Sequence, residues 1–245
     1  MSVPQVQPGR RMPFGFWKLC LLLVAVIGLS LLGVPLVFKV VLQTLGGSEG
    51  APVVALAAAM LTQTAIMFGV FYGLAIQLWG VTWRQVGLRP SSAVWYFRAV
   101  LLAILAMLLV ALVSVAMESL LGGPIDNPQV GMLAPGGSSI FSAIVMLILV
   151  AGLAPLVEEL LFRGLVYRWI SERYGMWIAL FFSALIFSCL HGIPALIPPL
   201  FVVGCLLAWL YEKSGSIWPC VAMHGVFNAM MLIGLYAGLA AGIEP

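Results

Sequence analysis

Apolar residues in this chain are gathered into seven long runs, separated by short polar or glycine-rich segments. A helix that crosses the hydrocarbon core of a bilayer, about 30 Å thick, needs about 20 such residues. We therefore predict an all-α, polytopic helical membrane protein with about seven transmembrane helices. The runs are Leu19 to Phe38, Val53 to Leu78, Ala99 to Met117, Ile140 to Val157 and beyond, Met176 to Leu190, Ala195 to Tyr211, and Ile217 to Ala240.

The junction between the fifth and sixth runs is the least regular part of this pattern. His191, Gly192 and Pro194 are followed there by Pro198 and Pro199. Proline lacks the backbone N–H that a continuing helix requires. The backbone polar groups of this segment must therefore find hydrogen-bond partners inside the protein or at the outer interface. Six or eight spans are compatible with the same pattern.

Composition indicates that the solvent of this protein is lipid. Of its 245 residues, 63% are hydrophobic and only 8% are charged, against about 45 to 50% and about 25% in soluble domains. No soluble fold can cover that much apolar surface. We therefore expect an integral membrane protein in contact with the lipid bilayer.

The few basic residues predict the orientation, because short cytoplasmic loops keep an excess of Lys and Arg. With the N-terminus cytoplasmic and seven spans, 10 of the 11 basic residues fall inside and only Lys39 falls outside. The C-terminus is then outside. The net charge of +3 thus reports topology, and no nucleic-acid partner is needed to explain it. The ten are Arg10, Arg11, Lys18, Arg84, Arg89, Arg98, Arg163, Arg168, Arg173 and Lys213.

The pattern divides the chain into three parts. Residues 1–15 contain three prolines and predict a flexible cytoplasmic tail. Residues 16–137 hold the N-terminal transmembrane helices. Residues 138–245 form a transmembrane core that carries most of the polar chemistry.

Charged groups within a span are costly, so those that occur usually face a cavity and serve a function. The fourth run leads into Glu158, Glu159 and Arg163, and the only two histidines, His191 and His224, lie at or in apolar runs. Glu159 and Arg163 have the i and i+4 spacing of a helical ion pair. Glu158, about 100° around the helix, is left free to face elsewhere.

Spacing along the helices predicts that these residues meet. If the fourth and fifth helices form an antiparallel hairpin near residues 174–175, Glu158 and His191 lie at the same depth, about 24 Å from the turn. His224 and Asn228 are i and i+4, so both can point at one spot. Pro155 cannot donate to the carbonyl of residue 151, which loosens the helix one turn before the glutamates.

Each of these features also has a plain structural interpretation. The Glu-Glu-Arg group is compatible with the charged cytoplasmic end of a span. His191 is compatible with an interfacial loop, and His224 with Asn228 is compatible with hydrogen bonding between helices. Their coincidence in one half of the chain favours a functional site.

At these residues the sequence resembles the CAAX protease and bacteriocin-processing family of intramembrane peptidases, which includes the type II prenyl-protein endopeptidases and many bacterial immunity-type proteins. The resemblance covers about residues 138–232. The matching motifs are E-E-x-x-x-R at Glu158, Glu159 and Arg163, F-x-x-x-H at Phe187 and His191, and H-x-x-x-N at His224 and Asn228.

The resemblance implies that the chain is an intramembrane endopeptidase that needs no cofactor. It implies that Glu158 and His191 activate water, that His224 and Asn228 stabilise the oxyanion, and that Glu159 with Arg163 supports them. Desolvation makes a buried carboxylate a stronger base, which agrees with the first role.

The implied substrate is a membrane-associated protein or peptide, with prenylation left open because the segment between the second and third motifs is short. We expect an integral protein of a prokaryotic cytoplasmic membrane, with its active site open to the cytoplasmic side.

Other functions use the same residues. Glu158, His191 and His224 are a ligand set that can hold catalytic zinc with one position open. Cys220 and His224, at i and i+4, are compatible with a Cys-His dyad. A proton-coupled transporter or a non-enzymatic membrane scaffold or immunity protein is also compatible with buried charges, although a transporter usually shows broken helices in both halves.

Overall fold

A computed structural model describes residues 11–46, 48, 50–123, 133 and 139–242. Within these residues the chain is built from helices and their connections, without strands. The predicted all-α class is confirmed. Six helical segments are long and apolar enough to span a membrane, and a seventh apolar helix is shorter.

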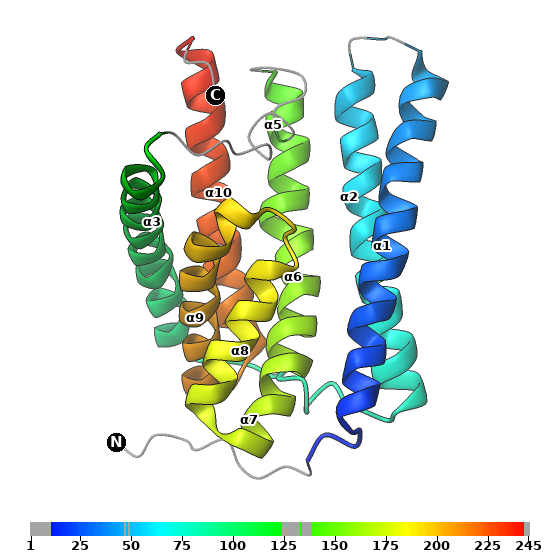
Figure 1. The fold of residues 1–245 in the computed structure, drawn as a ribbon, viewed down its shortest axis with the longest axis vertical. Helices are drawn as coiled ribbons and strands as arrows, with labels where there is room; N and C mark the ends of the chain where they lie inside the picture. The colour runs from blue at the N-terminus through cyan, green and yellow to red at the C-terminus, as the bar shows by residue number, and fades with distance from the viewer. Residues whose placement is uncertain (1–10, 47, 49, 124–132, 134–138, 243–245) are drawn as a thin grey trace.

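The helices follow the seven apolar runs in order (Figure 1). Three of the long segments contain changes of helix type, either π-helical stretches or a short 3₁₀ turn. The elements are α1 (Phe16–Leu45); α2 (Ala51–Val70) with η1 (Phe71–Leu78); α3 (Ala93–Leu121); α5 (Ile140–Met146), η2 (Leu147–Leu153), α6 (Ala154–Glu159), η3 (Leu160–Tyr167) and α7 (Arg168–Tyr174); α8 (Met176–Cys189); η4 (Pro194–Leu196) with α9 (Ile197–Ser214); and α10 (Ile217–Ala240).

The fifth helix, α8, is a short one and stops inside the bundle. Its 14 residues extend about 21 Å at helical rise, less than the hydrocarbon thickness. Gly192 has a φ of 73°, a left-handed conformation that glycine adopts without strain, and Pro194 opens η4. The chain therefore turns back, and Figure 1 shows the α8–α9 hairpin ending about halfway up the bundle.

Successive segments alternate in direction, so α1 starts at one end of the bundle and α10 finishes at the other (Figure 1). We call the end where α1 starts the basic end. Eight of the ten described basic residues lie there, and Lys39 lies on the upper part of α1. The eight are Arg11, Lys18, Arg84, Arg89, Arg98, Arg168, Arg173 and Lys213.

Arg163 corrects the charge count made from the sequence. Its side chain is only 1% exposed and is paired with Glu159, so it lies inside the bundle and not in a loop. The asymmetry remains strong without it, because eight of the other nine described basic residues share one end.

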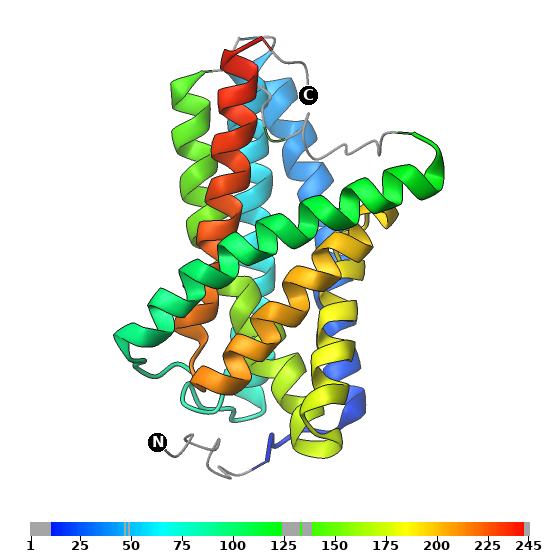
Figure 2. The same ribbon diagram turned by 90° about the vertical axis from the view of Figure 1, so that its left-hand side faces the viewer.

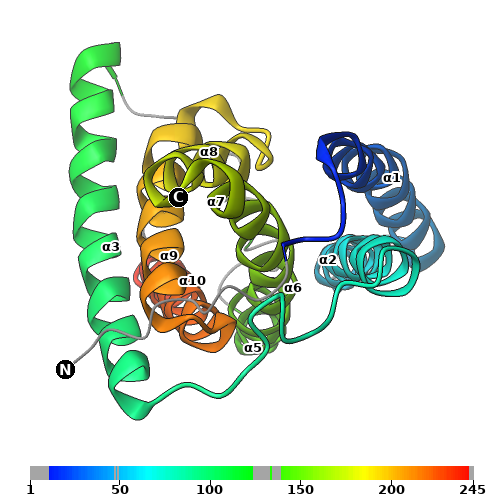
Figure 3. The same ribbon diagram turned by 90° about the horizontal axis from the view of Figure 1, so that it is seen from below.

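The long fourth segment, from α5 to α7, stands at the centre of the molecule. Seen from below, α1 and α2 stand on one side of it and α3 lies beyond α9 and α10 (Figure 3). Helix α3 is strongly tilted and crosses α9 and α10 diagonally (Figure 2). Many of its leucine and valine side chains remain exposed, as expected for a surface that contacts lipid.

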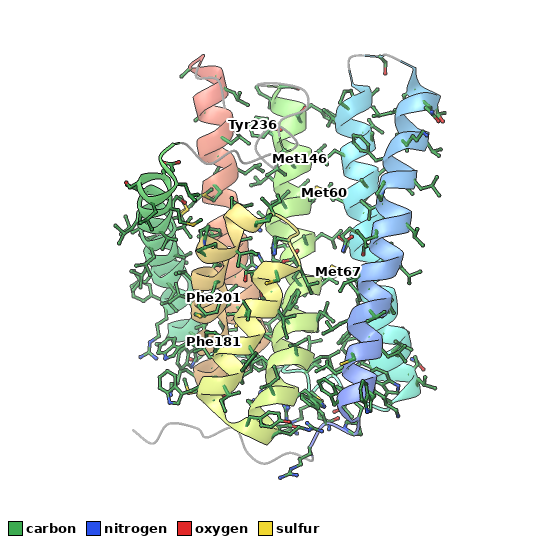
Figure 4. The ribbon with its side chains drawn as sticks, viewed as in Figure 1. Met60, Met67, Met146, Phe181, Phe201 and Tyr236 are labelled. Atoms are coloured by element: carbon green, nitrogen blue, oxygen red, sulfur yellow. The ribbon has the colours of Figure 1, made fainter. Side chains whose placement is uncertain are left out.

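Two apolar cores hold these helices together. The larger one surrounds η3 and α7 near the basic end, and a smaller one joins α2, α5, η2 and α10 toward the other end. Met146 and Tyr236 belong to the smaller core, and Figure 4 shows them between α5 and α10. Phe181 and Phe201 meet edge to face across the α8–α9 hairpin, with ring centroids 5.4 Å apart.

Part of the predicted tail is packed against the bundle. Met12 and Phe14 are buried, the Met12 N–H donates to Glu172 over 2.7 Å, and the Trp169 indole N–H donates to the Phe14 carbonyl over 3.0 Å. Any free tail therefore ends before Met12. Residues 1–10 lie outside the described part of the chain.

Candidate active site

The helix that carries the glutamates is irregular on both sides of them. Helix α6, which holds Glu158 and Glu159, is flanked by the π-helical segments η2 and η3. Within η2 the backbone pairs five residues apart, as in the bond from the Ala154 N–H to the Leu149 carbonyl. Such π segments are frequent at functional sites.

Pro155 explains why the carbonyl of Val150 needs an outside donor. Ala154, four residues on, already donates to Leu149, and Pro155, five residues on, has no N–H. The side-chain Nδ2 of Asn228 supplies the missing hydrogen bond to the Val150 carbonyl over 2.9 Å. The last span is thus attached to the fourth segment at the irregularity that Pro155 creates.

A glycine allows α10 to approach the fourth segment closely at this level. A Cβ placed on Gly225 would lie only 2.4 Å from the carbonyl oxygen of Ala151. That distance is far inside van der Waals contact, so only glycine fits without movement. His224, the neighbour of Gly225, is brought level with the glutamates by this contact.

We expect Gly225→Ala to destabilise the protein by about 1 to 3 kcal/mol, because the new methyl group must push α10 away from backbone atoms. Thermal unfolding in detergent measures the effect. Gly234→Ala is the matched control, since a Cβ at Gly234 on the same helix has no heavy atom within 4 Å. Equal unfolding midpoints for the two variants would contradict the expectation.

The ion pair expected from the i and i+4 spacing is present and fully buried. Arg163 Nη1 lies 3.1 Å from Glu159 Oε1, with side chains 1% and 0% exposed. Arg163 Nη2 also donates to the Gly204 carbonyl on α9 over 3.2 Å. Gly204 itself packs closely on Ala184 of α8, so the guanidinium joins the fourth segment to the hairpin.

His224 lies between the two carboxylates. Its Nδ1 is 2.9 Å from Glu159 Oε1, so this nitrogen donates its hydrogen to that carboxylate. Its Nε2 is 3.7 Å from Glu158 Oε2. One imidazole ring therefore faces Glu159 with one nitrogen and Glu158 with the other.

His191 is fixed by the backbone of the helix before it. Its Nδ1 lies 2.8 Å from the Phe187 carbonyl, which can only accept, so Nδ1 carries the hydrogen and Nε2 is left with a lone pair. The Phe187 ring stands edge to face against both histidines, with centroids 4.8 Å from His191 and 5.8 Å from His224. The guanidinium of Arg163 lies 4.6 Å from the centre of the same ring.

These residues border one cavity of about 420 Å³. Its walls come from α2, α3, η2, α6, α8, η4, α9 and α10, and they are mostly aliphatic or aromatic. Glu158, His191, His224 and Asn228 are the polar exceptions together with Ser114. The structure therefore brings all four predicted catalytic residues to one cavity, with Glu159 and Arg163 buried behind them.

The described residues of the cavity wall do not form a group of three His, Cys, Asp or Glu side chains that could bind one metal ion. Both nitrogens of His224 face carboxylates. The alternative zinc set of Glu158, His191 and His224 is not among arrangements of three ligands that the described side chains form.

Cys220 faces away from the cavity. Its thiol lies 3.5 Å from the Leu207 carbonyl and 3.8 Å from the Ser216 carbonyl, and its side chain is fully buried. It is not in the cavity wall, and His224 pairs with carboxylates instead. The geometry therefore gives no support to a Cys-His dyad.

Sequence reasoning missed two contributors to this site. In the sequence Phe187 is only the first residue of the F-x-x-x-H motif, whereas in the structure its ring contacts both histidines and Arg163. The bond between Glu159 and His224 was also missed. The position of Phe187 one helical turn before His191 was an available signal for the first, because i and i+4 side chains meet.

Comparison with known proteins agrees with this geometry. Residues 140–230 match the family model described as Type II CAAX prenyl endopeptidase Rce1-like. All three motifs fall within the matched residues, so the predicted resemblance is confirmed there. No curated protein and no solved structure matches the chain. The family match supports a CAAX-type intramembrane protease, with a membrane-associated protein as the general class of substrate.

Proposed function

Because residues 140–230 match the type II CAAX prenyl endopeptidase family, we propose that this chain is an intramembrane endopeptidase of the glutamate type. It hydrolyses a peptide bond in a membrane-associated or lipidated protein or peptide. The observation that carries the proposal is the shared cavity wall of Glu158, His191, His224 and Asn228. Ionisable and polar side chains inside an apolar bundle are costly, so a cluster of them favours a functional site.

Glu158 acts as the general base. Its side chain is 21% exposed, whereas Glu159 is 0% exposed, so Glu158 is the carboxylate that a water molecule in the cavity can reach. It accepts a proton as the water oxygen forms its bond to the scissile carbonyl carbon. His191 assists through Nε2, whose lone pair can accept a hydrogen bond from the same water.

His224 and Asn228 stabilise the oxyanion that forms on the carbonyl. Glu159 holds the Nδ1 side of His224, so a proton on Nε2 can be donated into the cavity. Asn228 uses one amide hydrogen for Val150 and keeps the second for the oxyanion. When the C–N bond breaks, Glu158 returns its proton to the leaving amine, which balances the reaction.

Glu159 and Arg163 position these groups without meeting the substrate. Arg163 reaches both Glu159 and the α9 backbone, and Glu159 reaches His224. This chain of contacts fixes the catalytic histidine relative to the α8–α9 hairpin. We also propose that the N-terminus is cytoplasmic, in a prokaryotic cytoplasmic membrane, on the basis of the basic end and the family's bacterial members.

The decisive experiment is cleavage of candidate membrane-anchored peptides, with and without a prenyl group, by the purified protein in liposomes. Mass spectrometry of the products identifies the bond that is cut. We expect cleavage that persists at full rate after treatment with a zinc chelator. Cleavage that is lost on chelation and restored by zinc would contradict the glutamate mechanism, and no cleavage of any peptide would favour a binding role.

A further inference from the structure

The cavity extends in one direction from the glutamates. On α10 its wall runs from His224 to Leu235, toward the C-terminal end of that helix. On the fourth segment it runs from Glu158 back to Val150, toward the same end of the bundle. Glu158 and His224 therefore form its floor, and the cavity lies on the side remote from the basic end.

The space between the floor and the basic end is closed. All eleven residues from Leu160 to Ile170 are buried. The Glu159–Arg163 pair lies directly behind the floor, fully buried. On α10, Cys220 and Met223 are fully buried below His224. A peptide has no route to Glu158 through this layer without unpacking the larger core.

The short α8–α9 hairpin leaves the other side less enclosed. Its turn contributes His191 and Leu196 to the cavity wall, and the first turn of α9 contributes Leu200. The nearby Gly192 and Pro194 are exposed. Beyond this turn, only the longer helices continue toward the far end of the bundle (Figure 1). An approaching chain therefore meets the site by passing over the hairpin turn.

The distribution of basic residues indicates which side of the membrane each end of the bundle faces. Eight described basic residues lie at the closed end, and only Lys39 lies toward the open end. The positive-inside rule places the closed end in the cytoplasm. The expectations of a cytoplasmic N-terminus and of a site that opens to the cytoplasm are therefore incompatible with each other, and the charges favour keeping the first.

We propose that the substrate reaches Glu158 from the extracytoplasmic half of the bilayer. That the ligand is a peptide rests on the proposed function. The route of the ligand rests on the position of the cavity. The substrate class is then a membrane-inserted or exported polypeptide segment, whose apolar side chains would match the mostly aliphatic and aromatic cavity wall. The C-terminal tail of a protein that stays in the cytoplasm does not fit this route.

Cysteine accessibility tests the route independently of catalysis. The full-length protein, with Cys20, Cys189, Cys205 and Cys220 replaced by alanine, carries single cysteines at Ser114 or Leu200 in the cavity wall. Tyr174, which is exposed at the basic end, supplies the reference cysteine. A membrane-impermeant charged thiol reagent is added to intact cells and, separately, to inside-out vesicles.

We expect Ser114→Cys and Leu200→Cys to be modified in intact cells, and Tyr174→Cys only in inside-out vesicles. Cavity cysteines that react only from the cytoplasmic side, or from neither side, would overturn the proposal. So would a Tyr174→Cys that reacts in intact cells. No substrate is involved, so the labelling pattern tests the route independently of peptidase activity. Failure of the proposed function would instead appear as absence of cleavage.

Discussion

Replacement of Glu158 by glutamine is expected to lower the rate of peptide cleavage by about 10³-fold, within the range that general-base catalysis contributes. Glutamine keeps the volume of the side chain but cannot accept a proton from water. Since Glu158 makes no buried ion pair with Arg163 and is the more exposed carboxylate, the fold is expected to tolerate the change. Single-turnover cleavage of a reconstituted membrane-anchored peptide measures the effect.

The matched control is Glu118→Gln, which removes a carboxylate near the end of α3, outside the cavity wall. It is expected to cleave at the wild-type rate. Both variants should elute and unfold like the parent protein. A Glu158→Gln variant that keeps more than a tenth of the parental rate would remove Glu158 from the role of base.

Loss of the buried arginine should have the largest effect on stability. Arg163→Met leaves the charge of Glu159 unpaired at a position with 0% exposure, and breaking a buried pair in this way typically costs about 3 to 5 kcal/mol. It also removes the bond to the Gly204 carbonyl, so the α8–α9 hairpin loses a tie to the fourth segment. Unfolding in detergent by heat or denaturant reports the loss.

A double variant separates the ion pair from the volume of the side chain. Glu159→Gln combined with Arg163→Met removes both charges, while the Gln oxygen can still accept from His224 Nδ1. We expect it to recover part of the stability that Arg163→Met loses, because no unpaired charge remains. If the double variant is less stable than Arg163→Met alone, the unpaired charge is not the source of the cost.

The sequence predicts the helices of this fold well, because each apolar run is long and the runs are separated by turn residues. The length of α8 was harder to place. The sequence indicates a helix break at His191, Gly192 and Pro194. It does not predict that the hairpin ends halfway along the bundle. Depth depends on how α8 packs against α9 and η3, and that tertiary arrangement has no local signal. The π-helical segments have none either, apart from Pro155.

The site residues were predicted because ionisable side chains are rare in apolar runs. Glu158, His191, His224 and Asn228 do line one cavity. Their mutual contacts were less predictable. A separation of about 100° around a helix suggested that Glu158 and Glu159 face different partners, but the two nitrogens of one imidazole point in diverging directions, and His224 reaches both carboxylates.

The number of basic residues in each loop predicts the orientation of the helices, but it does not predict the direction in which the cavity opens. The positive-inside rule concerns loops at the ends of spans, whereas access depends on which layers of the core are filled. Arg163 shows the difference, since it counted as a loop charge in the sequence and lies in the filled layer of the structure.

We expect the short hairpin to make access to the candidate site sensitive to the thickness of the membrane. Helix α8 covers about 21 Å of a hydrocarbon core of about 30 Å, so roughly 9 Å of acyl chain lies between the hairpin turn and the far interface. Hydrolysis consumes water, and the cavity along α10 from His224 to Leu235 is the path by which water can pass this layer. Lipids with shorter chains, or local thinning around a helix of this length, bring the interface closer to His191. The thickness of the bilayer then influences how readily water reaches the site.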